Sequence, residues 1–408
     1  MSNAIRNKDA LADLGVSLPR LEHLDKYLQS LVDDKKHSYV GFHVQRRGVP
    51  IFEGYYGVSS HGGSPLTRDG IHPMQSVTKP FTATCCAILQ EDGLLDFWEP
   101  VSNYFPDLKE GEKAEIALWH LLCHTSGFDE EATEKFFETY IKDELGIEIS
   151  EEATEDEKLD LYMTARVKAE LPEMERGWDA VNDMYRSVSL KAPLAAKTGT
   201  SFSYFNIGYI MLSEIVAKVS GMPYIEFVQK RIFEPLGMTD SFFIMPEDKR
   251  DRYVTRDPAF RSGEYMNSEE LMNNTGAAGG LKSTLPDLVR FAQMFLNNGT
   301  LDGVRILSPA SVRLMTTDHN SHIPDSFWRE RWLGANWGFG WDVKNGKKDD
   351  LGMLRGDRSY NHCGYGGSRL HVDPDAEVVV ALYLVEQRED AACDDQSNAM
   401  NVLYSSLD

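Results

Sequence analysis

One segment combines a possible nucleophile with a possible base: Ser76-Val77-Thr78-Lys79. At the start of a helix, a spacing of three residues puts Ser76 and Lys79 on the same face, one turn apart. A serine hydroxyl is a weak nucleophile until a base removes its proton, and a lysine can be that base if burial leaves it partly neutral. The N–H groups at a helix N-terminus can also stabilise a developing oxyanion. By itself the S-x-x-K pattern favours a capping serine followed by a surface lysine. Its position after a strand pair and a loop, at the start of a mostly apolar helix, favours the catalytic interpretation instead.

A phenol and an amide stand directly before an apolar helical pattern, in Tyr204-Phe205-Asn206. A phenol near a lysine can have its pKa lowered and relay a proton. An asparagine amide can hydrogen-bond both a lysine and a substrate carbonyl. The alternative is an aromatic residue that only packs at a helix start. A second Y-x-N, Tyr265-Met266-Asn267, lies in a polar stretch with no apolar helix after it, and we discount it.

A glycine-rich run, His362-Cys363-Gly364-Tyr365-Gly366-Gly367, comes directly before an alternating strand pattern. Glycines on an edge strand let a backbone N–H group approach a ligand closely. Such a strand can present a second oxyanion donor opposite Ser76. A tight glycine turn is the alternative, and it accounts for the glycines but not for the histidine.

Apolar periodicity predicts the elements that must position these residues. Two alternating runs, 39–48 and 50–58, predict a β-hairpin. The pattern after Ser76 predicts a buried helix that ends at Gly93. Strands near both chain ends with helices between them predict one α/β domain whose sheet is completed by both termini. The other expected helices are 19–34, 205–235, 285–318 and 393–405, and the other expected strands are 337–343, 368–374 and 376–385.

An acidic segment, residues 129–160, holds 14 acidic residues against 3 lysines. Its apolar residues, among them Phe137 and Ile141, keep helical spacing. This pattern predicts inserted helices with a solvated acidic face. The alternative is a lid over a pocket, which would control substrate access.

Composition narrows the possible partners. The 408 residues are 42% hydrophobic and 26% charged, as in an ordinary globular protein. A net charge of −22 argues against nucleic acid and anionic membranes, because both attract a basic surface. Residues 1–15 lack the apolar core of a signal peptide, and no membrane span is predicted. The cysteine spacing favours neither a disulfide framework nor a zinc site. We therefore expect no metal, no cofactor and a cytoplasmic location. The cysteines are Cys85, Cys86, Cys123, Cys363 and Cys393.

In this order, Ser76-Val77-Thr78-Lys79, Tyr204-Phe205-Asn206 and His362-Cys363-Gly364 resemble the three active-site motifs of serine β-lactamases and penicillin-binding proteins. The connecting segments resemble the class C β-lactamase-like branch, which includes family VIII carboxylesterases, D-stereospecific peptidases, amide hydrolases and an acyltransferase. The resemblance runs from about residue 40 to residue 385. It implies an α/β (α+β) fold, in which an antiparallel sheet from both chain ends is flanked by helices and joined to a mainly helical domain. The expected division is 1–110, 111–285 and 286–408.

Two departures from the family pattern bear on function. Lys197-Thr198-Gly199 spells the family's K-T-G triad but precedes Tyr204 instead of following it, so we interpret it as a decoy. The slot that K-T-G normally fills holds His362-Cys363-Gly364. A histidine, only partly charged near pH 7, would anchor a substrate carboxylate less well than a lysine. This lowers the expectation of a true β-lactamase.

The resemblance implies a serine hydrolase that forms an acyl-enzyme with an ester or amide of a small molecule. Ser76 is the expected nucleophile, Lys79 the base and Tyr204 its assistant. The N–H groups of Ser76 and, by analogy with the residue after the third motif, Tyr365 are the expected oxyanion donors.

The remaining expected substrate-binding residues are Asn206, His362 and Gly364. Acyl transfer through the same acyl-enzyme, hydrolysis of a β-lactam or D-peptide, and a catalytically inactive scaffold protein stay open as alternatives. The acyl group, the leaving group and the oligomeric state are left undetermined.

Overall fold

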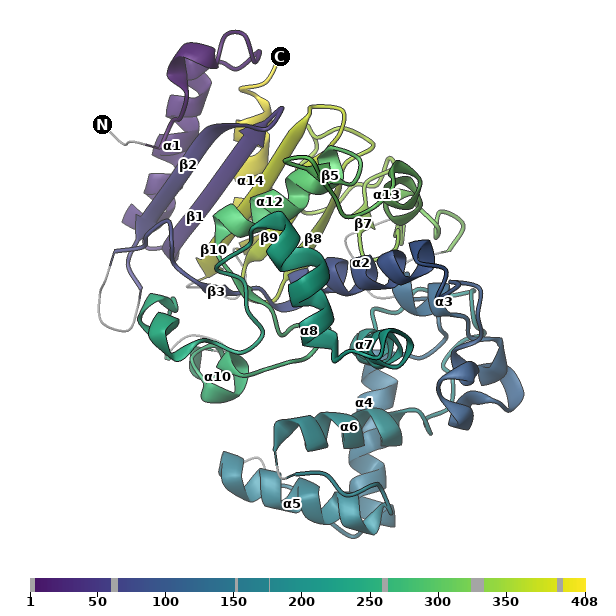
Figure 1. Cartoon of the computed structure of the whole chain (residues 1–408). Coiled ribbons are helices and arrows are strands. Elements are labelled where there is room, and N and C mark those ends of the chain that lie inside the picture. Colours follow the sequence, from purple (N-terminus) through teal and green to yellow (C-terminus); the bar gives the residue numbers. More distant parts are fainter. Residues whose placement is uncertain are drawn as a thin grey trace.

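The structure, a computed structural model, describes residues 4–59, 65–150, 153–175, 177–258, 263–323, 334–386 and 392–408. A six-stranded antiparallel sheet with the order β2-β1-β10-β9-β8-β7 forms the upper part of the molecule (Figure 1). Its first two strands come from the N-terminal part of the chain and the other four from the C-terminal part, which confirms the predicted architecture. The strands are β1 (His37–Arg46), β2 (Val49–Gly57), β7 (Asp342–Val343), β8 (Tyr360–Gly364), β9 (Ser368–Asp373) and β10 (Val378–Glu386).

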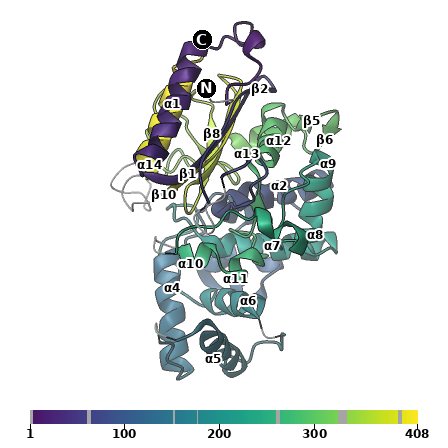
Figure 2. The same cartoon turned by 90° about the vertical axis from the view of Figure 1, so that its left-hand side faces the viewer.

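Helices cover both faces of the sheet (Figure 2). On one face, α1 (Leu18–Asp33) and α14 (Ala392–Tyr404) pack against alternate residues of β1, such as Val40 and Phe42. On the other face lie α2 (Thr78–Glu91) and α12 (Leu285–Leu296). Since both faces are covered, almost every residue of β1 and β10 is buried, whatever its side-chain direction.

The predicted elements differ from the observed ones at three places where glycines turn the chain. The expected helical stretch 205–235 is interrupted at Gly221, where φ is +69°. Of the expected strand 337–343, only Asp342–Val343 joins the sheet, because the chain turns back on itself: Gly338 N–H donates to the Trp341 carbonyl (2.8 Å), and Trp337 forms an isolated bridge with Asp342. Gly340 in this turn has φ +81° and lies against α2. The expected helical stretch 285–318 is split by a small hairpin after Gly299, where φ is +98°. Its parts are α12, β5 (Thr300–Leu301), β6 (Val304–Arg305) and α13 (Pro309–Thr316).

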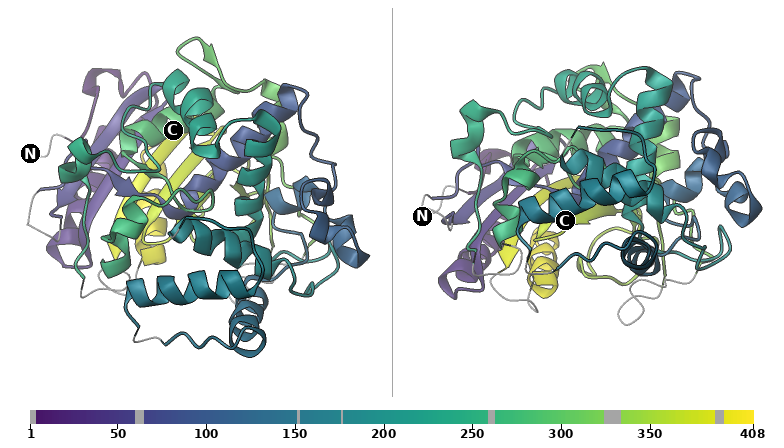
Figure 3. Two further views of the ribbon diagram at one scale, coloured as in Figure 1. Left: turned by 60° about the horizontal axis from the view of Figure 1, so that its bottom comes forward. Right: turned by 90° about the horizontal axis from the view of Figure 1, so that it is seen from below.

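Helices also fill the lower half of the molecule and include the acidic segment (Figures 1 and 3). There α4 (Glu130–Thr139), a π-helical turn and α5 (Glu155–Lys168) pack with α6 (Trp178–Ser189) around a small core that contains Phe137 and Ile141. Helices are therefore confirmed for this segment; Glu151 and Glu152 lie outside the described residues.

The other regular elements are short, apart from one helix that carries part of the site. That helix is α7 (Asn206–Ser220), which packs against α2. The short helices are α3 (Leu118–Leu122), α8 (Tyr224–Val228), α9 (Glu234–Leu236), α10 (Gly263–Met266) and α11 (Glu269–Met272), and the remaining strand pair is β3 (His72–Pro73) with β4 (Lys282–Ser283). Single turns of 3-10 or π helix are Lys8–Ala10, Gln75–Val77, Val101–Asn103, Pro106–Leu108, Gly111–Glu115, Tyr140–Glu144, Gln229–Phe233 and Glu247–Arg252.

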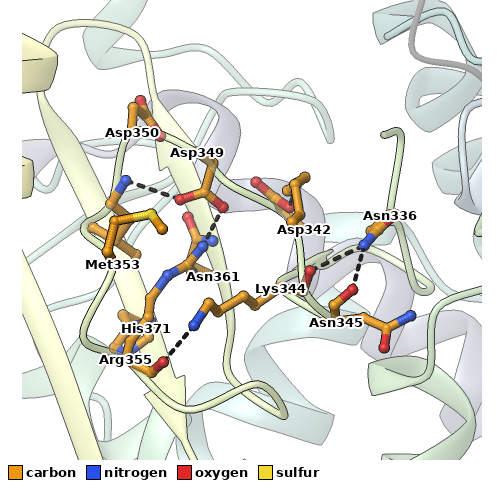
Figure 4. A network of polar contacts seen from close by, with 12 residues as sticks. Asn336, Asp342, Lys344, Asn345, Asp349, Asp350, Met353, Arg355, Asn361 and His371 are labelled. Atoms are coloured by element: carbon orange, nitrogen blue, oxygen red, sulfur yellow. Dashed lines mark hydrogen bonds and ion pairs between the residues drawn. The ribbon is translucent and has the colours of Figure 1, made fainter. Parts of the chain in front are cut away.

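A polar network lies against β8 and β9 (Figure 4), and it touches α14 where Met353 N–H donates to Asn401 (3.1 Å). Arg355 and Asp349 pair there with only 1% of each side chain exposed. Arg369 on β9 donates to Asp350 (2.9 Å) and to Asn361 on β8 (3.1 Å). On this part of the sheet, the residues that cover β8 and β9 are therefore paired charges and not the apolar side chains that cover β1.

Within the described ranges, no helix is both long and apolar enough to cross a bilayer. Free thiols are found at Cys85, Cys86, Cys123 and Cys363. The side chain of Cys393 lies outside the described part of the chain.

Candidate active site

The expected nucleophile sits at a sharp change of direction between β3 and α2. Ser76 is the middle residue of the 3-10 turn Gln75–Val77, and Gln75 before it has φ +50°. A non-glycine residue in this left-handed region costs on the order of 1–3 kcal/mol and persists where the surroundings hold it. The turn places Ser76 one helical turn ahead of Lys79, whose Nζ lies 3.1 Å from Ser76 Oγ. The proximity predicted from S-x-x-K is therefore present.

Lys79 is completely buried, and its amine has three partners. Besides Ser76, Nζ donates to Asn206 Oδ1 (2.8 Å) and to the Ala278 carbonyl (2.9 Å). Burial lowers the pKa of Lys79 from 10.5 to about 7, against the opposing influence of Glu130 and Cys363. The Asn206 and Ala278 oxygens can only accept hydrogen bonds. A neutral Lys79 amine keeps its two N–H bonds toward them, so its lone pair points at Ser76.

A lowered lysine pKa does not by itself identify a base. Lys282 on β4 is also buried, with a pKa lowered to about 7 by burial. Its amine donates to the carbonyls of Phe243 (2.5 Å) and Asn274 (3.0 Å). Lys79 differs because one of its partners is a hydroxyl that can give up a proton.

Tyr204 lies immediately before α7 and is a neutral phenol. Burial raises its pKa well above 10, while a side-chain hydrogen bond with Ser76 opposes this. The expectation that a nearby lysine lowers this pKa is therefore wrong, because desolvation exceeds any stabilisation of the phenolate. The Lys79 Nζ lies 4.6 Å from the centre of the Tyr204 ring. Tyr204 can relay a proton but does not start the reaction as a phenolate.

Two residues that the sequence did not single out hold the Tyr204–Asn206 segment. Glu130, in the first turn of α4, accepts from Asn206 N–H (2.9 Å) and from Asn206 Nδ2 (2.8 Å). His124 Nδ1 accepts from Phe205 N–H (3.0 Å), and its ring stacks on Tyr204 at 4.4 Å. Composition predicts a solvated face for the segment that contains Glu130, and none of the three motifs includes His124. The signal for His124 was its place in a connecting segment that resembles the family.

The third motif lies on β8, next to the serine turn. Ser368 Oγ donates to the Met74 carbonyl (2.9 Å), and a Cβ built at Gly364 would come within 2.2 Å of the same carbonyl oxygen. Gly364 therefore permits the close approach of β8 to Ser76. Tyr365, the following residue, is 47% exposed. The N–H groups of Ser76 and Tyr365 as oxyanion donors stay a prediction.

His362 is buried beside Tyr204, with 6.2 Å between the ring centres. Burial and the charge of Lys79 lower its pKa to about 3, so the ring is neutral at pH 7 and not partly charged as expected. Its Nδ1–H donates to the Cys363 carbonyl (2.7 Å), because a carbonyl can only accept. Nε2 is then an acceptor, and it has no hydrogen-bond partner within the described part of the chain.

The two discounted motifs have other places in the fold. The Lys197 side chain is exposed. Its backbone carbonyl accepts hydrogen bonds from Thr200, which closes a turn. The Asn267 side chain bonds the backbone of Arg256 in both directions (2.7 Å each). Neither Lys197 nor Asn267 is among the hydrogen-bond partners of Ser76 or Lys79 in the described structure.

Comparison with known proteins identifies the family and the fold of the chain. The family model described as Beta-lactamase matches residues 24–402. Protein Rv1367c of Mycobacterium tuberculosis (strain ATCC 25618 / H37Rv) is 26% identical over 366 residues, which cover 81% of each chain. A solved family VIII carboxylesterase has the same fold, with a TM-score of 0.69 at 18% identity, covering 96% of this chain and 99% of its own. A solved class C β-lactamase has a TM-score of 0.67 at 18% identity, covering 96% and 97%.

At such identities the two solved structures establish the fold alone. The family model, however, spans most of the chain, and the matched region contains every residue of the site described above. By sequence and by fold, this chain belongs to the β-lactamase family of serine hydrolases.

Proposed function

We propose that this protein is a serine hydrolase that acts, through an acyl-enzyme on Ser76, on an ester or amide of a small molecule, as a carboxylesterase does. The observation that carries the proposal is the Lys79 amine, which lies 3.1 Å from Ser76 Oγ and has a pKa of about 7. A general base works best when its pKa is near the working pH. A catalytically inactive scaffold protein is not favoured, because Ser76, Lys79 and Tyr204 lie together: the Lys79 amine is 3.1 Å from Ser76 Oγ and 4.6 Å from the centre of the Tyr204 ring.

The proposed reaction begins with neutral Lys79 taking the proton of Ser76 as Oγ attacks the substrate carbonyl carbon. The π electrons of the C=O bond move to the carbonyl oxygen, which becomes an oxyanion stabilised by the N–H groups of Ser76 and Tyr365. When the oxyanion collapses, the bond to the leaving group breaks and the leaving group takes a proton from Tyr204. The Lys79 ammonium restores that proton to Tyr204, and both groups are again neutral.

Deacylation repeats these steps with water as the nucleophile. Water loses a proton to the base, attacks the acyl carbon and releases the acid, while Ser76 recovers its proton. An alcohol or amine in place of water gives acyl transfer, so the same acyl-enzyme serves both reactions.

The site supports an ester or neutral amide better than a substrate whose carboxylate must be anchored at the third motif. His362 is neutral there, with a pKa of about 3, and offers an acceptor where a carboxylate needs a donor or a positive charge. This favours the carboxylesterase alternative over β-lactam or D-peptide hydrolysis.

Intact-protein mass spectrometry after incubation with a fluorophosphonate tests the proposal. The reagent exchanges its P–F bond for a P–O bond to the nucleophile, so the wild type should gain one adduct and Ser76→Ala none. An adduct on both proteins, or on neither, excludes Ser76. Rates with p-nitrophenyl esters, a chromogenic β-lactam and a D-alanyl dipeptide then rank the substrate classes, and added short alcohols reveal acyl transfer by the ester products.

A further inference from the structure

We propose that Glu130 is a positioning residue for the Lys79 base: it fixes the Asn206 amide with its oxygen toward Lys79 and, as a carboxylate, sets the pH range in which Ser76 is acylated. The inference rests on the proposed function, since it concerns the base of that reaction. It gives a chemical role to one residue of the acidic segment, which the sequence assigned to a solvated face.

The hydrogen bonds around Asn206 determine which way its amide points. Glu130 Oε1 accepts from Asn206 Nδ2 (2.8 Å), and Glu130 Oε2 accepts from Asn206 N–H (2.9 Å). Both carboxylate oxygens therefore face donors. With Nδ2 held by Glu130, Oδ1 is turned to Lys79 Nζ at 2.8 Å. A flipped amide would put N–H groups against the Lys79 amine and an oxygen against the carboxylate, which loses both contacts.

The neighbouring carboxylate strengthens this connection between α4 and the site. Asp129 Oδ1 caps α4 by accepting from Ala132 N–H (3.0 Å), and its Oδ2 accepts from Ser203 Oγ (2.9 Å). Asp129 and Glu130 thus hold the chain on both sides of Tyr204. A shift of α4 would move the phenol and the amide together.

Glu130 also differs in charge from the other titratable groups that face Lys79. Those groups are His124 from the loop after α3, His362 and Cys363 from β8, Tyr204, and Tyr209 on α7, whose ring centre lies 5.6 Å from Lys79 Nζ. Burial lowers the pKa of both histidines and raises that of both phenols, and the pKa of the thiol is also raised, so all five are neutral near pH 7.

Burial also raises the pKa of Glu130, but its hydrogen bonds with Asn206 and the charge of Lys79 favour the ionised form. Both Glu130 oxygens accept hydrogen bonds from N–H groups of Asn206 (2.8 and 2.9 Å), and this geometry assigns Glu130 as a carboxylate, the charged member of these six groups. A negative charge stabilises the protonated form of Lys79, so it raises the pKa that burial lowers. Removing the charge must move the Lys79 titration to lower pH.

The experiment measures the rate of fluorophosphonate labelling of Ser76 from pH 5 to pH 9, by intact mass, in four proteins. The wild-type rate should rise through a pH of about 7, where Lys79 loses its proton. Glu130→Gln should shift this rise about 0.5–1 pH unit lower. Its plateau rate should fall about 10- to 100-fold, because one of the two contacts to Asn206 is lost.

Two further variants separate charge from shape. Glu130→Asp keeps the charge but shortens the side chain. The labelling rate should therefore rise at the same pH as in the wild type, while the rate reached at high pH falls. Glu131→Gln removes a charge from an exposed neighbour in the same helical turn and should match the wild type.

The inference is overturned if Glu130→Gln lowers the plateau without moving the rise, which is the behaviour of a residue that only supports the fold. It is also overturned if Glu130→Gln behaves as the wild type. Should Glu130→Gln fail to fold, Glu130→Asp decides: an unchanged plateau contradicts the positioning role. Absence of wild-type labelling at every pH would instead overturn the proposed function, which keeps the two failures distinct.

Discussion

Lys79 can serve as a base only in its neutral form, so the proposed chemistry depends on pH in one direction. Below its pKa of about 7 the amine is protonated, and kcat/KM should fall about tenfold for each pH unit below that value. Lys79→Arg keeps a positive charge that does not dissociate in proteins, so acylation should be nearly lost. Acylation rates of purified variants check this, and more than a tenth of the wild-type rate in Lys79→Arg would refute the role.

The absence of a side chain at Gly364 allows β8 to lie close to the serine turn, and this spacing can be tested. A methyl group at this position would meet the Met74 carbonyl oxygen and Ser368 Oγ, each at 2.2 Å, so β8 must move away from the serine turn. If Tyr365 supplies an oxyanion donor, Gly364→Ala should reduce kcat about 10²- to 10³-fold, as for a lost donor. An activity within threefold of the wild type would place the second donor elsewhere.

Lys197 should be dispensable, although it spells the family triad with Thr198 and Gly199. Its side chain is exposed in a turn that precedes Tyr204. Lys197→Ala should leave kcat/KM within a few fold, measured beside Lys79→Ala on the same ester. Equal losses in the two variants would mean that the motifs are wrongly assigned.

Among the elements, the helices of the acidic segment bear on substrate charge. A hollow of about 530 Å³ beside α4 and α6 has apolar residues such as Phe137 and Ile141 at its floor. Glu134, Glu138 and Glu148 also line it. Their negative potential should disfavour anionic substrates at low salt and act over about 8–10 Å.

Two p-nitrophenyl esters, one neutral and one with a carboxylate, measured at low and high salt, test this expectation. Changing Glu134, Glu138 and Glu148 to glutamine should lower KM for the anionic ester and leave kcat for the neutral ester nearly unchanged. Glutamines at Glu110 and Glu112, which are exposed outside the segment, provide the control. A preference for the anionic ester that fades with salt would contradict the electrostatic effect.

The same elements show what the sequence could and could not predict. Regular apolar periods predicted α1, the β1–β2 hairpin and α2, because apolar residues recur along the whole length of each of these elements. The order of the motifs predicted Ser76, Lys79 and Tyr204. Glu130 was missed because the composition of its segment is typical of a surface, and a charge count over 14 acidic residues cannot identify a partly buried carboxylate among them. Its contact with Asn206 joins residues 76 positions apart, which spacing does not reveal.

At the scale of the whole molecule, the polar network against β8 and β9 should matter for stability. Asp349→Asn leaves Arg355 buried without its charged partner, which should lower the free energy of unfolding by about 3–5 kcal/mol. Denaturant unfolding followed by fluorescence measures this. Arg358→Gln, in a pair whose arginine is 71% exposed, should cost less than about 1 kcal/mol. Similar losses of unfolding free energy in the two variants would show that the buried pair contributes no more to stability than the exposed pair.

The pairing of β1 with β10 has a consequence for how the enzyme is made. Val44 lies opposite Val380, so the centre of the sheet joins parts of the chain that leave the ribosome far apart in time. Until β10 is synthesised, the nascent β1–β2 hairpin has an unpaired apolar edge, which invites aggregation. His362 and Gly364 on β8 are also synthesised late, so the Ser76 turn lacks these neighbours during most of translation. We expect released chains that stop before β8 to be unreactive toward the fluorophosphonate, so that a reactive serine forms only once the sheet can close.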